Sequence, residues 1–448
     1  LWELADRAGK RVISLNLPVS SPPPKVNGII IPGLLCPELS PATVHPPQAY
    51  DRYIKPRKDY LIVNKDPQDT VRGYAEQALA AERVRLEVAR ELMDQEQWDI
   101  FYLQIQGSDP LQHKVWWALD PKAKGYDPQE HAEALAFYRG CDEIIGEIVK
   151  APQGEVLTLI VSDHGFCGLE STVGVNVWLR QHEYLHLRAK EPANQWEATK
   201  TQLKNKIPPA KALAGCYGRV RQRMSDFLGR RLKGRGRTPL FCELDMVHMR
   251  RVIDFEKTRA FCLGALGGML YINATPPQRR ELGLKLTEQL LAELGPESPQ
   301  PVIDAVKTGA QVYGEDCDPD LLPDLVLEYR EGVIARINTS GDDVVLTGLR
   351  QGRQPGTHSR MGVYVAQGPG IHSGKKFAAE IVDITPTVLA YLDLPIPRHM
   401  DGKILEKAFI EPPEIKYEDV AFKDAKSTGY TDEEQAAVEK HLADLGYL

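Results

Sequence analysis

The amino-acid sequence predicts an α/β protein in which helices cover a mostly parallel sheet on both faces. The first observation is that helical and extended patterns alternate along most of the chain, which is typical of parallel strands joined by crossover helices. The second is size, because 448 residues, 42% of them hydrophobic, are enough for a large buried core. The third is a break in the alternation near residues 185–240, which indicates an insertion or cap within one domain.

The first half of the chain is predicted to contain three helices, each followed by a strand. In the second helix, apolar residues recur at intervals of three and four positions, and the third is also amphipathic. The strands are short apolar runs rich in β-branched or aromatic residues. In order, these elements are a helix at 2–9 ended by Gly9, a strand at 12–15, a helix at 70–95, a strand at 98–106, a helix at 131–151 and a strand at 155–161.

The same alternation returns after the break. The expected elements are a strand at 267–273, a helix at 277–294, strands at 324–329 and 361–368, and a helix at 384–394. The last residues, TDEEQAAVEKHLADLGYL, begin with a threonine that can cap a helix and carry acids in the first turn. A terminal helix is therefore predicted there.

The break itself is strongly basic. Residues 200–237 contain 12 Lys or Arg and a single acid, Asp226. A solvated helical insertion is the favoured interpretation. Contact with an anionic substrate, a nucleic acid or a membrane surface is the alternative that this segment leaves open.

Composition restricts the remaining classes. No apolar run is long enough to span a bilayer, and a net charge of −7 argues against wholesale binding of nucleic acid. Seven cysteines without a CxxC motif or regular spacing suggest reduced core residues. Because the chain begins with Leu1 rather than Met, the natural N-terminus is expected to be absent, and the localisation stays open.

Five polar residues stand beside predicted strands. Asp109 and His113 follow the strand at 98–106, Asp163 and His164 follow the strand at 155–161, and His358 precedes the strand at 361–368. Ligands of open α/β sheets bind beyond the carboxyl ends of the strands, so the first two groups should converge there. Imidazole and carboxylate together suit Zn²⁺ or Mn²⁺ better than Ca²⁺ or Mg²⁺.

The motifs SDPLQH, VSDHGF and GTH with a later GPG loop, in this order, resemble the alkaline phosphatase superfamily. Within it, the chain is most similar to the type I phosphodiesterase/nucleotide pyrophosphatase branch. GKRVISLNLPVSSPPPKVNG, VIDFEKTRAFCLGALGGMLYIN and DITPTVLAYLDLPIPRHMDGK extend the resemblance over nearly the whole chain. It implies a three-layer α/β/α sandwich over residues 1–448, interrupted by the basic insertion.

This resemblance implies a phosphoric ester hydrolase with two divalent metal ions, Zn²⁺ or alternatively Mn²⁺. Asp109, His113 and His358 match the ligands of one metal, and Asp163 and His164 match two ligands of the other. Gly165 is expected to let the backbone turn so that both side chains reach the metal. Two such ions can activate a hydroxyl nucleophile and hold phosphate oxygens during displacement. The expected substrate is a small anionic phosphate ester, with diesters preferred over monoesters.

The resemblance also implies parts that these residues do not match. The Thr or Ser nucleophile and a further Asp ligand belong to a first strand and helix start, which would lie upstream of Leu1. The five matched ligands provide three ligands for one metal ion and only two for the other, whereas a catalytic zinc ion usually has three protein ligands. The 448 residues are therefore expected to be an inactive fragment of an enzyme.

Other functions remain as alternatives. A phosphomutase or phosphomonoesterase of the same superfamily would use the same metal core, and a non-enzymatic metal-binding scaffold would use it without catalysis. A sulfatase is disfavoured because PELSP after Cys36 does not match its Cys-x-Pro-x-Arg nucleophile motif. His182, Glu183 and His186 form an HExxH sequence, which on a helix could bind zinc through the histidines, with Glu183 as general base, as in a metalloprotease. We interpret it as a chance match.

Overall fold

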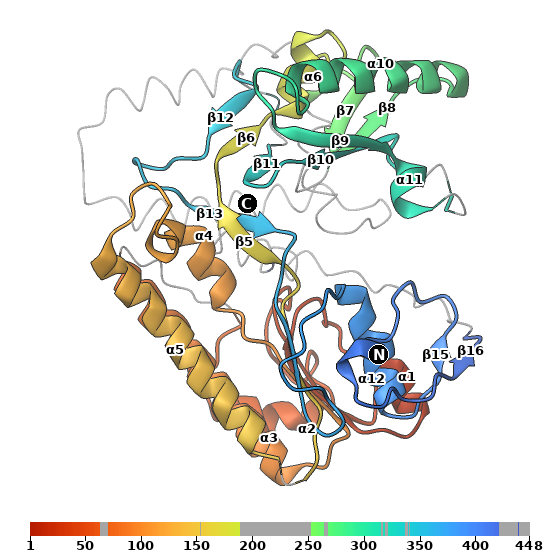
Figure 1. The fold of residues 1–448 in the computed structure, drawn as a ribbon. Helices are drawn as coiled ribbons and strands as arrows, with labels where there is room; N and C mark the ends of the chain where they lie inside the picture. Colours follow the sequence, from red (N-terminus) through yellow and green to blue (C-terminus); the bar gives the residue numbers. More distant parts are fainter. Residues whose placement is uncertain are drawn as a thin grey trace, which may run out of the picture. The chain divides into compact units, whose positions relative to one another are not determined.

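The computed structural model describes residues 1–62, 70–152, 154–188, 252–263, 268–314, 317–318, 321–336, 339, 341–420 and 438 (Figure 1). The chain divides into two compact units. Unit 1 comprises Leu1–Glu170 and Thr347–Leu448, and unit 2 comprises Ser171–Leu346. The five candidate metal ligands all belong to unit 1.

Unit 1 contains a parallel sheet of order β2-β1-β3, formed by Gly28–Pro32, Val12–Leu17 and Ile100–Leu103. Alternate side chains of these strands point to opposite faces. On one face, Ile13 and Leu15 pack in a core with Val88 and Leu92 of helix α3 (Val71–Gln95). The opposite face packs against α1 (Trp2–Arg7) and α12 (Ile384–Tyr391). The sheet is therefore covered by helices on both faces.

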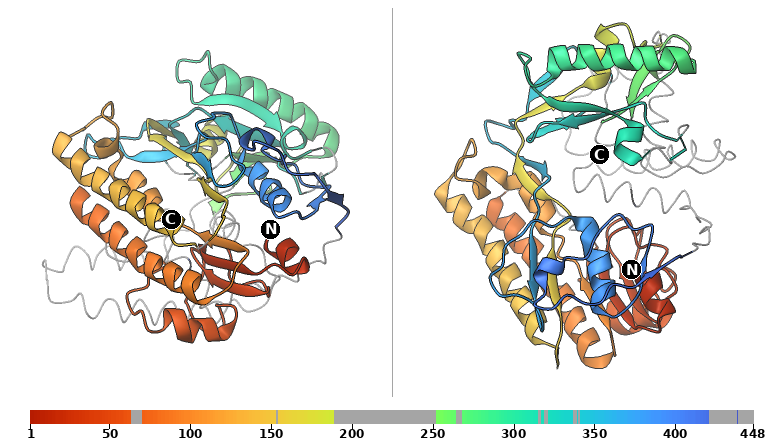
Figure 2. Two further views of the ribbon diagram at one scale, coloured as in Figure 1. Left: turned by 60° about the horizontal axis from the view of Figure 1, so that its bottom comes forward. Right: turned by 45° about the vertical axis from the view of Figure 1, so that its right-hand side comes forward.

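Two long helices of unit 1 lie side by side. Helix α5 (Pro128–Lys150) lies along α3, as Figure 2 shows from two directions. Asp127 caps the first turn of α5 by accepting hydrogen bonds from two backbone N–H groups. Ion pairs Arg72–Glu133, Arg83–Glu143 and Arg90–Glu147 join the helices in order, so the two helices run in the same direction.

The remaining strands of unit 1 pair in twos. β4 (Thr158–Val161) is antiparallel to β14 (Tyr364–Gln367), and β5 (Gly165–Gly168) is antiparallel to β13 (Gly356–Ser359). Helix α4 (Ser108–Leu119) follows β3 and packs against both β13 and α5. These contacts bring residues near 109, 164 and 358 together. Short elements complete the unit: α2 (Pro47–Ala49), η1 (Tyr50–Ile54), η2 (Ile381–Asp383), η3 (Glu406–Ala408), β15 (Ile396–Pro397) and β16 (Tyr417–Glu418).

Unit 2 contains an antiparallel sheet of order β7-β8-β10-β9. Helix α10 (Pro276–Leu294) buries Leu282, Leu286, Leu290 and Leu294 in one core with strand residues such as Cys262 and Leu325. The strands are Ala260–Leu263, Met269–Ile272, Leu325–Tyr329 and Ile303–Thr308. A second sheet has the order β11-β6-β12 and is formed, in that order, by Val333–Ala335, Ser171–Val173 and Val345–Thr347. The described part of unit 2 also contains the helices α6 (Val175–Gln181) and α11 (Gly309–Tyr313).

The predicted helices and strands occur among the described residues, with shifted ends. The expectation of a mostly parallel sheet is correct for β2-β1-β3 and for the pair β6–β11 of unit 2. It is wrong for the sheet β7-β8-β10-β9 and for the pairs β4–β14 and β5–β13. In unit 2, β7 and β8 follow each other too closely for the crossover that parallel pairing needs, so they pair as antiparallel neighbours.

The predictions for two segments have no counterpart among the described residues. Most of 185–240, including the basic segment 200–237, and nearly all of the expected terminal helix after 430 lie outside the described residues. Among the helices that the structure describes, none is long and apolar enough to cross a membrane.

Candidate metal centre

Asp109 and His113 lie on the same side of helix α4, because residues four apart are neighbours on a helix surface. Asp109 is in the first turn, where the helix dipole favours a negative charge. His358 lies within strand β13, opposite Phe166 of β5. Asp109 and His113 are therefore carried by a helix and His358 by a strand.

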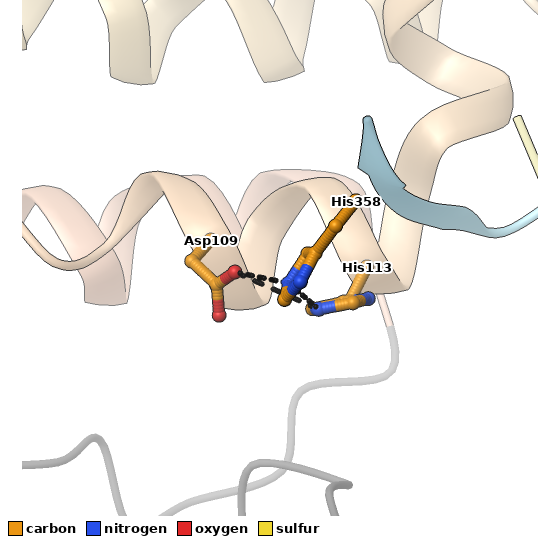
Figure 3. A group of neighbouring side chains, drawn as sticks. All are labelled: Asp109, His113 and His358. Carbon is orange, nitrogen blue, oxygen red and sulfur yellow. Dashed lines mark hydrogen bonds and ion pairs between the residues drawn. The ribbon is translucent and has the colours of Figure 1, made fainter. Parts of the chain in front are cut away.

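The polar atoms of these three side chains converge (Figure 3). Asp109 Oδ1 lies 3.1 Å from His358 Nε2 and 3.6 Å from His113 Nε2. The two histidine Nε2 atoms are 2.9 Å apart. One potential ligand atom from each residue lies within 4.8 Å of the other two. One carboxylate and two imidazoles so arranged form a donor set that fits a zinc or manganese ion.

His164 belongs to the same group of side chains. Its Nε2 lies 3.8 Å from Asp109 Oδ1 and 3.6 Å from Asp163 Oδ2. Its ring stacks on His358, with the ring centroids 3.7 Å apart. The Asp163 side chain is 79% exposed, whereas that of Asp109 is 22% exposed. Asp109 Oδ1 thus has three imidazole nitrogens around it, and Asp163 lies on the open side.

Backbone carbonyls orient two of these histidines. His113 Nδ1 lies 3.1 Å from the carbonyl oxygen of Gly356, and His164 Nδ1 lies 3.1 Å from that of Gly165. A carbonyl oxygen only accepts hydrogen bonds, so each Nδ1 donates. In the neutral rings, the lone pair is then on Nε2, the atom nearest Asp109. Hydrogen bonds of this kind set the tautomer of metal-binding histidines.

Burial also favours the neutral form of His113. It lowers the pKa of His113 below the usual value, although the charge of Asp109 acts in the opposite direction. Neutral imidazole is the form that binds metal ions. His113 is therefore suited to the ligand role at neutral pH.

Phe166 packs among all three histidines. Its ring centroid lies 4.9 Å from that of His113, 5.4 Å from that of His164 and 5.1 Å from that of His358. The ring is nearly perpendicular to His113 and His358, a favourable arrangement for aromatic pairs. Phe166 therefore restricts the orientation of each imidazole from one side.

Two glycines permit the close strand contacts at this centre. A Cβ at Gly356 would lie 2.4 Å from the Gln112 carbonyl oxygen, and one at Gly165 would lie 1.9 Å from the Met361 carbonyl oxygen. Gly165 is the first residue of β5 and is not among the residues with positive φ, so a left-handed conformation is not the reason for glycine at this position. The close approach of the 361 segment requires glycine there.

The HExxH sequence is not helical in the structure. Helix α6 ends at Gln181, His182 is its C-cap, and Glu183 has a φ of 59°. His182 Nε2 instead lies 2.9 Å from Glu293 Oε1, and its ring stacks on Trp178. The geometry that a helical HExxH zinc site requires is therefore absent from these described residues.

The described cysteines are free thiols that differ in burial. Cys36, Cys141 and Cys262 are buried, Cys167 is partly buried and Cys317 is exposed. Burial raises the pKa of the Cys141 thiol to about 12, which keeps it protonated and unreactive.

Sequence reasoning missed the supporting residues around the candidate ligands. Phe166 and Gly356 lie inside the DHGF and GTH motifs, but only the pairing of β5 with β13 reveals what they contact. Glu82 and Arg85 had a sequence signal, because two charged residues fall among the buried positions of helix α3. Both side chains are buried, and their contacts are described below.

An α/β unit with converging Asp and His side chains beside its sheet belongs to the class of candidate metal-dependent hydrolases. The family model for type I phosphodiesterase/nucleotide pyrophosphatase matches residues 1–227, and the chain therefore belongs to this family, within the alkaline phosphatase superfamily. The family is metal-dependent and catalyses phosphoester hydrolysis. No curated protein and no solved structure gives a match to the chain. The matched residues include Asp109, His113, Asp163 and His164 but not His358.

Proposed function

We propose that this protein is a two-metal phosphodiesterase of the nucleotide pyrophosphatase type. Asp109, His113 and His358 would hold one divalent ion, and Asp163 and His164 would contribute to the second site. The observation that carries the proposal is the position of Asp109 Oδ1, which has the Nε2 atoms of three histidines within 3.8 Å. A carboxylate and neutral imidazoles favour Zn²⁺, with Mn²⁺ as the alternative.

The chain's own residues would perform three tasks at this centre. Gly356 and Gly165 carbonyls keep the lone pairs of His113 and His164 on the side of Asp109. Phe166 limits rotation of the imidazole rings. The exposed Asp163 leaves one side open to an incoming phosphate ester. When bound, the metal ions would supply Lewis-acid stabilisation of charge on the phosphoryl oxygens.

The proposed substrate class, the complete fold and the nucleophile rest on the family resemblance. A small anionic diester is the favoured substrate, and a complete three-layer sandwich around the sheet of unit 1 is the favoured fold. The Thr or Ser nucleophile and the further Asp ligand are expected upstream of Leu1, and this stays a prediction. An assay of the 448 residues beside the natural full-length protein tests it. Equal turnover would place the nucleophile within these residues.

The central experiment measures hydrolysis of aryl phosphate mono- and diesters by the natural full-length protein, with and without a chelator. We expect faster turnover of the diester, loss of activity with chelator, and recovery on adding Zn²⁺ or Mn²⁺. Activity that is insensitive to chelator would refute the metal mechanism. Preference for the monoester would favour the phosphomonoesterase alternative, and phosphate transfer within one substrate would favour a phosphomutase.

A further inference from the structure

Helix α3 carries a buried ion pair on its core-facing side. The Glu82 and Arg85 side chains are 1% and 3% exposed, and Glu82 Oε1 lies 2.6 Å from Arg85 Nη1. Removing two charges from water costs free energy that their attraction often fails to offset. Core packing alone therefore does not explain why this ion pair is buried here.

Glu82 holds the segment that leads into helix α4. Its Oε1 atom accepts hydrogen bonds from the backbone N–H groups of Gln106 at 3.0 Å and of Gly107 at 2.8 Å. These residues immediately precede α4, where N–H groups otherwise lack partners and the helix dipole favours a carboxylate. Glu82 thus binds the two backbone N–H groups that precede the first turn of α4.

The peptide between Gln106 and Gly107 connects Glu82 to Asp109, because its N–H donates to Glu82 and its carbonyl accepts from Asp109. The carbonyl of Gln106 accepts a hydrogen bond from the Asp109 N–H at 3.2 Å, and that of Gly107 accepts one from the Leu111 N–H at 3.3 Å. One hydrogen-bonded peptide therefore separates the buried carboxylate from the backbone of a proposed metal ligand.

Further contacts hold Arg85, the partner of Glu82, and Gly107, which precedes α4. Arg85 Nη2 donates to the carbonyl oxygens of Leu61 at 2.8 Å and Ile62 at 3.2 Å, which fixes the partner of Glu82. On the other side, a Cβ at Gly107 would come within 3.1 Å of Ala78 and Phe137. The start of α4 is therefore packed directly onto α3 and α5, with little room to shift.

We propose that Glu82 is a positioning residue for the metal centre, which sets the location of Asp109 by anchoring the Gln106 and Gly107 peptides. Arg85 orients the Glu82 carboxylate through the contact between its Nη1 and Glu82 Oε1. This inference rests on the proposed role of Asp109 as a metal ligand. Supporting residues around metal ligands typically contribute about 10- to 100-fold to metal affinity, so an effect of this size is expected from Glu82.

The first test compares Glu82→Gln with Glu91→Gln in the full-length protein. Glu91 is on the same helix and pairs with Arg57 at 2.6 Å, away from the described residues of the centre, which makes it a matched control for loss of an ion pair. Zn²⁺ or Mn²⁺ affinity is measured by calorimetric titration, and thermal unfolding is measured in parallel. We expect Glu82→Gln to weaken metal binding about tenfold and Glu91→Gln to leave it unchanged.

A second readout needs no metal. Amide hydrogen exchange at residues 106–111 of the metal-free protein should become faster in Glu82→Gln than in Glu91→Gln. Unchanged local exchange together with unchanged metal affinity would overturn the positioning role. If the wild-type protein binds no metal, the proposed function fails, and exchange at 106–111 still decides whether Glu82 positions this segment.

A double variant separates positioning from general stability. Glu82→Leu with Arg85→Leu replaces the ion pair by apolar side chains, a change that buried pairs often tolerate. We expect metal affinity to stay about tenfold weaker, because no acceptor remains for the Gln106 and Gly107 N–H groups, and thermal unfolding shows whether the double variant is folded. Recovery of wild-type metal affinity in a well-folded double variant would contradict the proposal.

Discussion

His113 Nε2 lies 2.9 Å from His358 Nε2, although 245 positions separate the two residues in the chain. The Gly356 carbonyl holds the proton of His113 on Nδ1, so the Nε2 lone pair faces the second imidazole. Two nitrogen lone pairs at this distance repel unless a proton or a cation lies between or beside them. Asp109 Oδ1 lies 3.6 Å from His113 Nε2 and 3.1 Å from His358 Nε2, an arrangement that agrees with the proposed metal site.

The first prediction concerns this pair. His358→Gln should weaken Zn²⁺ or Mn²⁺ binding by about 100-fold or more, because a direct ligand outweighs the supporting residues, whose loss costs about 10- to 100-fold. Calorimetric titration of the chelator-treated protein measures the change. His399→Gln, an exposed histidine outside the centre, is the control and should bind as the wild type does. Equal affinities for the two variants would remove His358 from the site.

The second prediction concerns Phe166. Phe166→Leu removes three ring contacts with histidines and should lower both metal affinity and phosphodiester turnover, with a stability loss of about 1 kcal/mol. Phe261→Leu in unit 2 also removes ring contacts, to Phe255 and Tyr271, and is the matched control. It should lower stability without changing metal affinity. If both variants bind metal equally well, Phe166 does not orient the imidazoles.

The third prediction contrasts two glycines. Gly165→Ala would place a Cβ 1.9 Å from the Met361 carbonyl oxygen, so the strand must shift, at a cost of about 2 kcal/mol. Gly146→Ala, within helix α5, meets no atom within 4 Å and should stabilise the protein by up to about 1 kcal/mol. Chemical denaturation of both variants gives the comparison. A neutral Gly165→Ala substitution would show that the 361 segment moves freely.

The fourth prediction concerns pH. Glu96, the C-cap of α3, accepts hydrogen bonds from the Tyr53 hydroxyl and the Arg11 guanidinium, and these lower the pKa of Glu96. A carboxyl with a lowered folded-state pKa stabilises the protein above its unfolded pKa of about 4.3, and this stabilisation is lost as the pH falls through the folded-state value.

Glu96→Gln should therefore reduce the free energy of unfolding by about 1 kcal/mol at pH 7, and the difference from wild type should shrink below about pH 4. Urea denaturation across this pH range measures it. Asp51→Asn, which removes the exposed pair with Lys55, is the control and should change stability little at any pH. A Glu96→Gln effect that is the same at pH 3 and pH 7 would exclude the charge of Glu96 as its cause.

Local sequence pattern predicted the individual elements well. The apolar stripe of residues 70–95 and the short strand at 324–329 correspond to α3 and β10. The reason is that burial of one face of a helix or strand imposes a period that can be read within that segment. Pairing direction was less accessible, and the parallel expectation failed for β7, β8, β9 and β10, because strand pairing depends on which distant segments meet.

The sequence by itself was enough to single out Asp and His residues as candidate metal ligands. Its motifs also showed the resemblance to the family to which the chain belongs. Only the tertiary structure decided that His164 approaches the same carboxylate oxygen as His113 and His358, and that Glu82 accepts hydrogen bonds from the Gln106 and Gly107 N–H groups before Asp109. Asp109 and His358 are 249 positions apart, and no local period relates them. Their meeting follows from the packing of α4 against β13, a contact that only the folded chain creates.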